Sequence, residues 1–138
     1  TQIIKRLSKV FGDGFGVFHS RYSDNERVEV WQKVQNGEYN FVVGVRSAVF
    51  LPFNDLSLII IDEEHEPSFK QHEPAPRYHA RDASVYLASM FHAKTLLGTA
   101  TPALETYHNA LEGKYGLVKL EERYGQVSIP TSLLPTYC

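Results

Sequence analysis

Four residues in a row, Asp62-Glu63-Glu64-His65, have side chains that can bind a divalent cation, orient water or move a proton. They come directly after the largely apolar stretch 56–61, which ends in three consecutive isoleucines. Such a run predicts a buried parallel strand. Because ligands of open α/β sheets bind outside the carboxyl ends of the strands, we expect this DEEH segment (residues 62–65) to lie at the functional site.

Three kinds of site use acids and histidines of this kind. A zinc protease needs His-Glu-x-x-His, and neither His65-Glu66 nor His72-Glu73 has the second histidine; the six histidines show no ligand spacing. A glycosidase pair is disfavoured, because neighbouring residues of an extended strand point to opposite faces unless a turn intervenes. The arrangement that uses both acids is a nucleotide site, in which Asp62 holds Mg²⁺ through water and Glu63 polarises the attacking water.

Polar residues also follow two other predicted strands. Arg46-Ser47 come after the apolar run 41–45 and form either a solvated loop or a contact to phosphate. The segment 98–102, Gly-Thr-Ala-Thr-Pro, comes after the short strand 95–98. Within it, Thr101 is expected to cap a helix that begins at Pro102, which leaves Gly98 and Thr99 unexplained.

A long segment from Pro67 to Arg77 without regular periodicity follows the DEEH segment. Loops of this length are usually functional or disordered. Aromatic and basic side chains are interleaved in it and just beyond it, a mixture that suits stacking bases while holding phosphates. A surface loop pinned by two aromatic rings explains the composition equally well. The candidate DNA-contacting residues here are Phe69, Lys70, Tyr78 and Arg81.

The elements that must position these residues alternate between helix and strand patterns. Apolar runs predict strands at 16–19, 41–45, 56–61, 95–98 and 117–120. Helical spacing predicts helices at 3–11, from the capping box Ser23–Glu26 to Gly37, at 79–93 and after Thr101. The inward faces are expected to be Val28, Trp31 and Val34 in the second helix and Ala83, Leu87 and Met90 in the third. This order predicts an α/β fold with a mostly parallel sheet flanked by helices.

Composition limits the class of protein. With 138 residues and 43% hydrophobic content, the chain is long enough for a single domain. Its net charge of -2 gives no overall cationic field, so a nucleic acid would have to bind a local surface. The single cysteine, Cys138, excludes a disulfide framework and fits a reducing compartment. No apolar run approaches the roughly 20 residues of a membrane span, so a soluble, cytoplasmic protein without a membrane partner is expected.

Four segments together resemble the motifs of superfamily 2 helicases, in matching order and spacing. Asp62 to His65 is similar to motif II, 98–102 to motif III, Gly44 to Ser47 to motif Ib, and Thr1-Gln2 to the end of motif Ia. More narrowly, 44–53, the Ser68-Phe69-Lys70-Gln71 segment and 77–82 resemble the primosomal protein N′ (PriA) family of bacterial replication-restart helicases. The resemblance covers the chain up to about Arg123.

The resemblance implies a partial RecA-like (P-loop NTPase) domain that uses ATP and Mg²⁺. Asp62 would hold the Mg²⁺ on ATP through water, Glu63 would activate water, and His65 would relay between the γ-phosphate and motif III. Thr99 and Thr101 would couple hydrolysis to movement. Arg46 and Ser47 would contact the DNA backbone, and the segment 68–78 matches the family's aromatic-rich loop, which would sense single-stranded DNA and gate ATP hydrolysis. The implied partners are single-stranded or forked DNA, primosome proteins and single-stranded-DNA-binding proteins.

Several parts of such a helicase are not found in this chain. No Gly-x-x-x-x-Gly-Lys-Ser/Thr occurs, so the Walker A strand and its phosphate loop are missing. Residues 1–125 are expected to be a partial first helicase lobe and 126–138 a poorly ordered tail, with the second lobe and its zinc site absent. We therefore expect the chain alone to be inactive. The alternatives are another superfamily 2 DNA translocase, or a non-catalytic DNA-binding module with the same fold.

Overall fold

The computed structural model describes residues 2–12, 14–19 and 21–120. Internal contacts divide the chain into two units, Thr1–Pro102 and Ala103–Cys138. In the described part of the second unit, residues 103–120, one helix is present, α4 (Leu104–Leu111). The boundary expected between residues 125 and 126, and the tail beyond it, lie outside the described residues and stay predictions.

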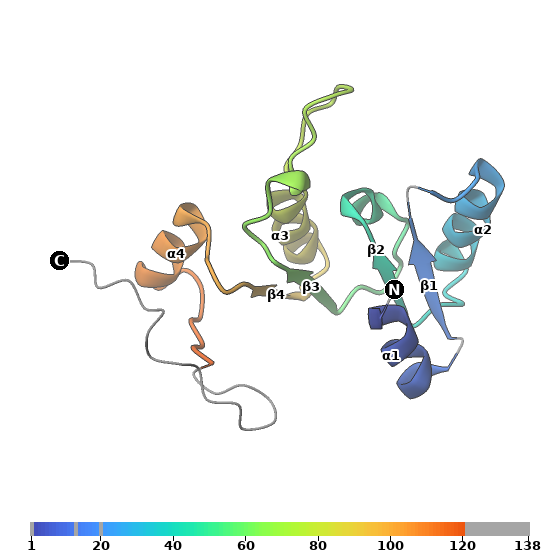
Figure 1. Ribbon diagram of the computed structural model, residues 1–138, viewed down its shortest axis with the longest axis horizontal. Coiled ribbons are helices and arrows are strands. Elements are labelled where there is room, and N and C mark those ends of the chain that lie inside the picture. Colours follow the sequence, from blue (N-terminus) through green and yellow to red (C-terminus); the bar gives the residue numbers. More distant parts are fainter. Residues whose placement is uncertain (1, 13, 20, 121–138) are drawn as a thin grey trace. The chain divides into compact units, whose positions relative to one another are not determined.

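The first unit alternates helices and strands in the predicted order (Figure 1). The described elements are α1 (Gln2–Phe11), β1 (Phe15–Phe18), α2 (Asp24–Gln35), β2 (Phe41–Gly44), η1 (Arg46–Phe50), β3 (Leu58–Asp62), η2 (Pro67–Phe69), α3 (Ala80–Met90) and β4 (Lys94–Gly98). Here η marks a 3-10 helix. The α/β class is confirmed, and the four strands described in this unit lie within about two residues of their predicted positions.

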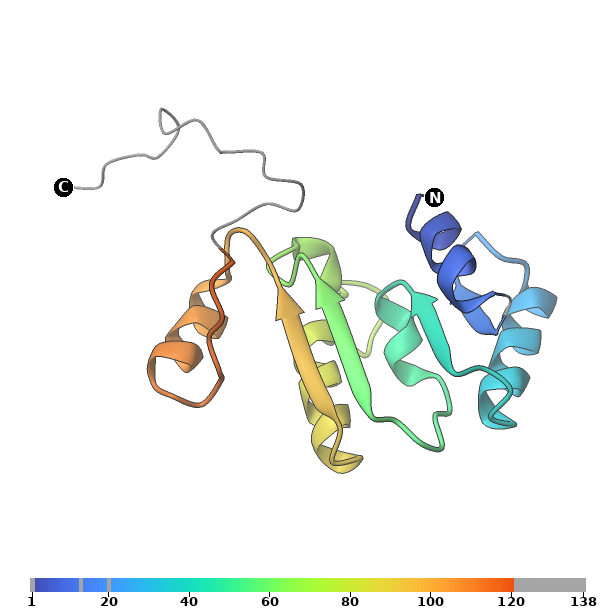
Figure 2. The ribbon, with the colours of Figure 1, turned by 90° about the horizontal axis from the view of Figure 1, so that it is seen from below.

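The described strands form two parallel ribbons, β1 with β2 and β3 with β4. In the second ribbon Leu58 pairs with Lys94 and Asp62 pairs with Gly98. Figure 2 shows the arrowheads of β3 and β4 at the same end of the ribbon. The parallel register therefore brings the DEEH segment and the segment 98–102 to one level.

The first ribbon packs around a small core to which β1, α2 and the chain after β2 contribute. Phe18, Val30, Val34 and Leu51 are buried together. α2 begins with the predicted capping box, in which Ser23 and Glu26 satisfy each other's backbone N–H groups. Its inward face is set by Val30 and Val34, whereas Val28 and Trp31 are exposed, so that part of the predicted stripe is wrong.

The second ribbon is covered on one face by α3. The covered face includes the buried Ile61. On the other face Leu58, Ile60 and Leu96 are 50%, 63% and 56% exposed, so the expectation of a strand buried on both sides is wrong. α3 approaches the ribbon with small residues, and its buried stripe is Ala80, Ser84 and Ala88. Of the predicted inward residues, Ala83 and Leu87 are half-buried and Met90 is exposed, so the predicted face is wrong.

Two predictions about the end of the described chain are wrong. Residues 117–120 are not a strand. Thr101 does not cap α4: Ala103 is at the N-cap position, without a side-chain cap hydrogen bond, and the backbone N–H of Thr101 donates to the hydroxyl of Thr99. Within residues 2–12, 14–19 and 21–120, no helix is both long and apolar enough to cross a membrane.

Candidate functional site

The chain turns sharply where β3 ends. Glu63 has a positive φ of 52°, in the left-handed region that costs a non-glycine residue roughly 1–3 kcal/mol. The turn is held by the N–H of Glu64, which donates to the carbonyl of Gly98 at 3.1 Å, and by the N–H of Glu66, which donates to the carbonyl of Glu63 at 2.8 Å. Asp62 and Glu63 therefore do not continue one extended strand, so the alternation of side chains along a strand does not argue against a glycosidase pair here.

His65 joins the two strand ends. Its Nδ1 lies 2.7 Å from the Thr99 hydroxyl and 3.5 Å from a carboxylate oxygen of Glu63, and its Nε2 lies 3.4 Å from the Thr101 hydroxyl. The Thr99 oxygen also accepts the backbone N–H of Thr101 at 3.1 Å. These contacts bring four of the sequence-predicted residues together and explain Thr99, which helix capping did not explain.

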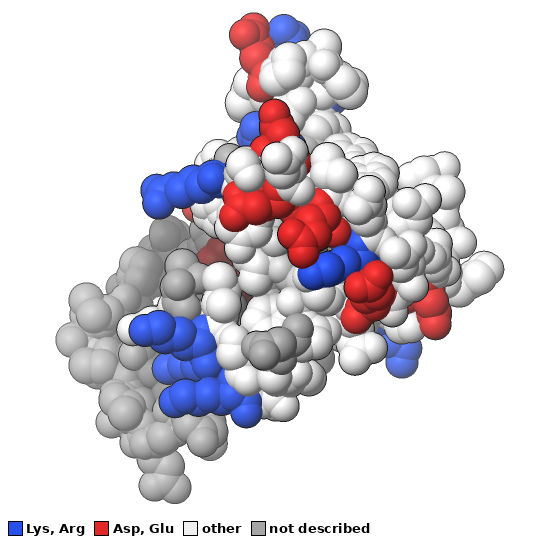
Figure 3. All heavy atoms as spheres, turned by 90° about the vertical axis from the view of Figure 1, so that its right-hand side faces the viewer, with Lys and Arg blue, Asp and Glu red and all other residues white. Residues whose placement is uncertain are grey.

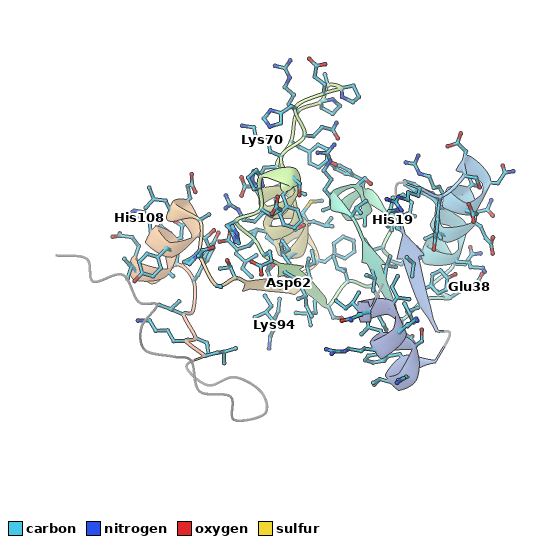
Figure 4. The ribbon with its side chains drawn as sticks, in the orientation of Figure 1. His19, Glu38, Asp62, Lys70, Lys94 and His108 are labelled. Carbon is cyan, nitrogen blue, oxygen red and sulfur yellow. The ribbon has the colours of Figure 1, made fainter. Side chains whose placement is uncertain are left out.

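Asp62 is the last residue of β3 and its side chain is exposed (Figure 4). Among the described residues no group of three or more His, Cys, Asp or Glu side chains could enclose a metal ion. A single exposed carboxylate at a strand end suits Mg²⁺, which keeps several waters and binds through one or two carboxylates together with phosphate oxygens.

Glu64 was not singled out from the sequence, yet it is the most deeply buried large side chain described, at 0% exposure. One of its carboxylate oxygens accepts a hydrogen bond from Arg81 at 3.0 Å. No local pattern indicates this pairing, because the two residues are far apart in the chain and meet only when α3 packs on the ribbon. The sequence feature that could have indicated a role for Glu64 is its position between two site residues, Glu63 and His65.

Arg81, predicted to contact DNA, is mostly enclosed by the protein. Its side chain is 11% exposed and also donates to Asp82 at 2.9 Å. Burial opposes its charge, but the hydrogen bonds to Asp82 and Glu64, together with the negative charges of these two residues, outweigh burial and raise the pKa of Arg81. The guanidinium is thus engaged within the chain, and its contact with DNA stays a prediction.

The segment 70–79, here called the loop, is closed by a backbone bridge and by hydrogen bonds from the Gln71 side chain. Lys70 and His79 form an antiparallel bridge, and the N–H of Gln71 donates to the carbonyl of Tyr78 at 2.8 Å. The Gln71 amide donates to the carbonyls of Pro74 and Pro76, at 2.8 and 3.2 Å. Figure 1 shows the loop rising beyond α3, and Figure 4 places Lys70 near its base.

The other predicted DNA-contacting residues surround the base of the loop. Lys70 is exposed, Phe69 is half-buried, and the ring of Tyr78 packs edge-on against Phe50 with centroids 4.7 Å apart. Arg46 donates to the carbonyls of Ser68 and Lys70, at 3.2 and 3.1 Å. Ser47 is half-buried in η1. The structure therefore brings the segment after β2 to the loop and leaves both phosphate contacts as predictions.

Charge is unevenly distributed over one face of the molecule. In Figure 3 acidic side chains gather across the middle of the view and basic ones below them. α2, which carries Asp24, Glu26 and Glu29, lies on this side in Figure 1, and the basic group is at the height of α1, which carries the exposed Lys5, Arg6 and Lys9. The described part of this face is mixed in sign.

Comparison with known proteins gives consistent matches. The family description of DEAD/DEAH box helicases matches residues 1–110. The chain is 43% identical over 129 residues to the replication restart protein PriA of Bacillus subtilis, covering 94% of this chain and 16% of that protein. It is 44% identical over 122 residues to PriA of Chlamydia pneumoniae (88% and 16%) and 42% identical over 123 residues to PriA of Helicobacter pylori (89% and 19%). The chain spans less than a fifth of the length of these relatives.

Proposed function

Because this chain belongs to the DEAD/DEAH box helicase family and has the α/β fold of a partial RecA-like domain, we propose that it is the part of an ATP-dependent 3′ to 5′ DNA helicase that holds the metal and water side of the ATP site. By itself it is inactive. The similarity to proteins named for replication restart supports a role in that process.

The observation that carries this proposal is the set of contacts around His65. A hydrogen bond of 2.7 Å between His65 and Thr99 connects the residue after the two acids of β3 to the segment after β4. A helicase must couple ATP hydrolysis at one strand end to a change in the neighbouring segment. A side-chain contact between these two strand ends meets that need.

The residues at the strand end fit the chemistry of ATP hydrolysis. Asp62 would hold Mg²⁺ through water, and the ion would neutralise charge on the phosphates. Glu63 would orient the attacking water, with His65 near enough to influence the Glu63 carboxylate at 3.5 Å. Thr99 and Thr101 would respond to a change at His65 through their hydroxyl groups.

The loop supplies the surface for single-stranded DNA. Its base carries the exposed Lys70 and the half-buried rings of Phe69 and Tyr78, which combine a cation for phosphates with faces for bases. Arg46 and Ser47 lie in the same region and are proposed to contribute phosphate contacts when DNA is present. Forked DNA, primosome proteins and single-stranded-DNA-binding proteins are the proposed partners of the complete gene product.

The first test is steady-state ATP hydrolysis by the 138-residue chain. We expect no turnover with or without single-stranded DNA, because the chain has no Lys-containing phosphate loop. Turnover that rises in proportion to the concentration of purified chain would contradict the proposed division of the ATP site.

The second test uses the complete gene product that carries this sequence. We expect hydrolysis stimulated by single-stranded DNA, and we expect Glu63→Gln to lower it by roughly a factor of 10² to 10⁴, the range for losing a group that activates water. Glu66→Gln makes the same chemical change at an exposed residue nearby and should leave hydrolysis intact. Equal rates for both variants would refute the role of Glu63.

A further inference from the structure

A buried ion pair stands between the loop and the DEEH segment. Glu64 is fully buried, and its carboxylate accepts a hydrogen bond of 3.0 Å from Arg81, whose side chain is 11% exposed. Removing two charges from water is costly, and breaking such a pair leaves an uncompensated charge. The two residues are therefore constrained to move together.

The Glu64 end of this pair lies inside the site. Its neighbours in sequence are Glu63 and His65, and its own N–H donates to the carbonyl of Gly98 at the end of β4. The backbone at Glu63 already has an unfavourable φ of 52°. A displacement of the Glu64 side chain would therefore also displace the two residues beside it, Glu63 and His65.

The Arg81 end of the pair is continuous with the loop. Arg81 lies in the first turn of α3, and His79, which caps this helix, closes the loop by bridging to Lys70. The other side of the loop base is held by Arg46, which donates to the carbonyls of Ser68 and Lys70. Arg46 therefore holds one side of the base, whereas Arg81, in the first turn of the helix that follows the other side, reaches the DEEH segment.

We propose that Glu64 and Arg81 are positioning residues that transmit the engagement of single-stranded DNA at the loop to Glu63 and His65. Neither residue touches the nucleotide. DNA that displaces the loop base shifts the start of α3, Arg81 moves with it, and Glu64 resets the turn that holds Glu63. This inference rests on the proposed function, because it requires hydrolysis at the DEEH segment and DNA at the loop.

The test is the ratio of ATP hydrolysis with and without oligothymidylate, measured on the complete gene product. Glu64→Leu combined with Arg81→Met removes both charges together, a replacement that buried ion pairs often tolerate. We expect the stimulation ratio, measured at saturating oligothymidylate so that a change in DNA affinity does not enter it, to fall about tenfold, within the range typical of coupled sites. Arg81→Lys keeps the charge but loses the planar group that reaches Glu64 and Asp82 together, so it should restore only part of the ratio.

A matched control removes an exposed ion pair. Glu29→Leu with Lys33→Met deletes the 2.7 Å pair on α2 and likewise replaces an acid and a base by apolar residues, away from the loop. This variant should keep the wild-type stimulation ratio. A buried pair that served stability alone would lower the melting temperature and leave the ratio unchanged in the folded fraction, and that result would overturn the proposal.

A measurement on the unmutated protein covers the case in which the double variant does not fold. Oligothymidylate should slow hydrogen exchange in peptides containing Glu64 and Glu66 as well as in those containing Gln71. Protection confined to residues 70–79 would overturn the inference and leave the proposed function intact. A wild-type protein without DNA-stimulated hydrolysis would instead overturn the proposed function, and the inference with it.

Discussion

At the scale of single residues, His65 is the point at which two segments distant in sequence meet. Its ring has a neighbour on both nitrogens, Thr99 on one and Thr101 on the other. In a neutral imidazole one nitrogen donates and the other accepts, so a change at one threonine alters what such a ring offers to the second. This makes the hydroxyl of Thr99 a sensitive place to test the site.

Thr99→Val removes that hydroxyl while keeping the shape of the side chain. A lost hydrogen bond of this kind costs roughly 1 kcal/mol, so we expect strand unwinding per ATP hydrolysed by the complete gene product to fall several-fold. Thr99→Ser keeps the hydroxyl and should retain most activity. A double-mutant cycle with His65→Ala should give a coupling of about 0.5–3 kcal/mol. If the effects of the two substitutions on unwinding are strictly additive, the 2.7 Å contact between His65 and Thr99 does not contribute to function.

At the scale of elements, two short features fix where the chain changes direction. The capping box of Ser23 and Glu26 starts α2, and Gly44 ends β2 at the point where η1 folds back. Each is a local device with a measurable contribution to stability, and each lies outside the proposed chemistry.

The capping box gives the chain an acid-sensitive contribution to stability. The Ser23 side chain, and then its backbone N–H, hydrogen-bond Glu26 and lower the pKa of that carboxyl below 4.5. A lowered folded-state pKa stabilises the fold above the unfolded value and loses this effect as pH falls through the folded value. Ser23→Ala should cost roughly 0.5–2 kcal/mol at neutral pH, and the difference from wild type should shrink below pH 4.5. Urea unfolding across this pH range measures it, with Ser8→Ala as a control that shows no such trend.

Gly44 is required because η1 approaches β2 closely. A Cβ built on Gly44 would overlap the Cβ of Ala48 and also crowd the Cβ of Phe18 at 3.4 Å. Gly44→Ala should therefore destabilise the chain by roughly 1–3 kcal/mol, the usual cost of overpacking. At Gly98 the nearest atom to a built Cβ is 3.6 Å away, so Gly98→Ala should unfold at nearly the wild-type urea concentration. Equal losses for the two variants would contradict this account.

At the scale of the whole chain, the sequence predicted the strand ends better than the partners of the side chains. The DEEH segment and the segment 98–102 lie together because parallel strands end at one edge, a rule that needs only the order of elements. The Glu64–Arg81 pair and the role of Arg46 depend on how α3 and η1 pack, which no local pattern contains. The predicted inward face of α3 is wrong for a similar reason, because the helix packs closely on the ribbon through Ala80, Ser84 and Ala88.

The uncovered face of the β3–β4 ribbon affects how the chain behaves in solution. Leu58, Ile60 and Leu96 form an apolar surface beside strand edges, which favours self-association. Ile60→Thr keeps the β-branched shape and should reduce concentration-dependent association measured by sedimentation velocity. Ile59→Thr, on the face toward α3, should instead lower the melting temperature. Association that persists unchanged with Ile60→Thr would place the contact elsewhere.

The parallel register of β3 with β4 also determines where this chain can gain or lose residues. Asp62 pairs with Gly98, and the loop between these strands closes on itself through the Lys70–His79 bridge. Insertions at the loop tip, 72–77, leave both pairings as they are. One residue inserted within β4 turns the hydroxyl of Thr99 to the opposite face and separates it from His65. Length variation among related chains should therefore collect at the loop tip and avoid the short strand beside it.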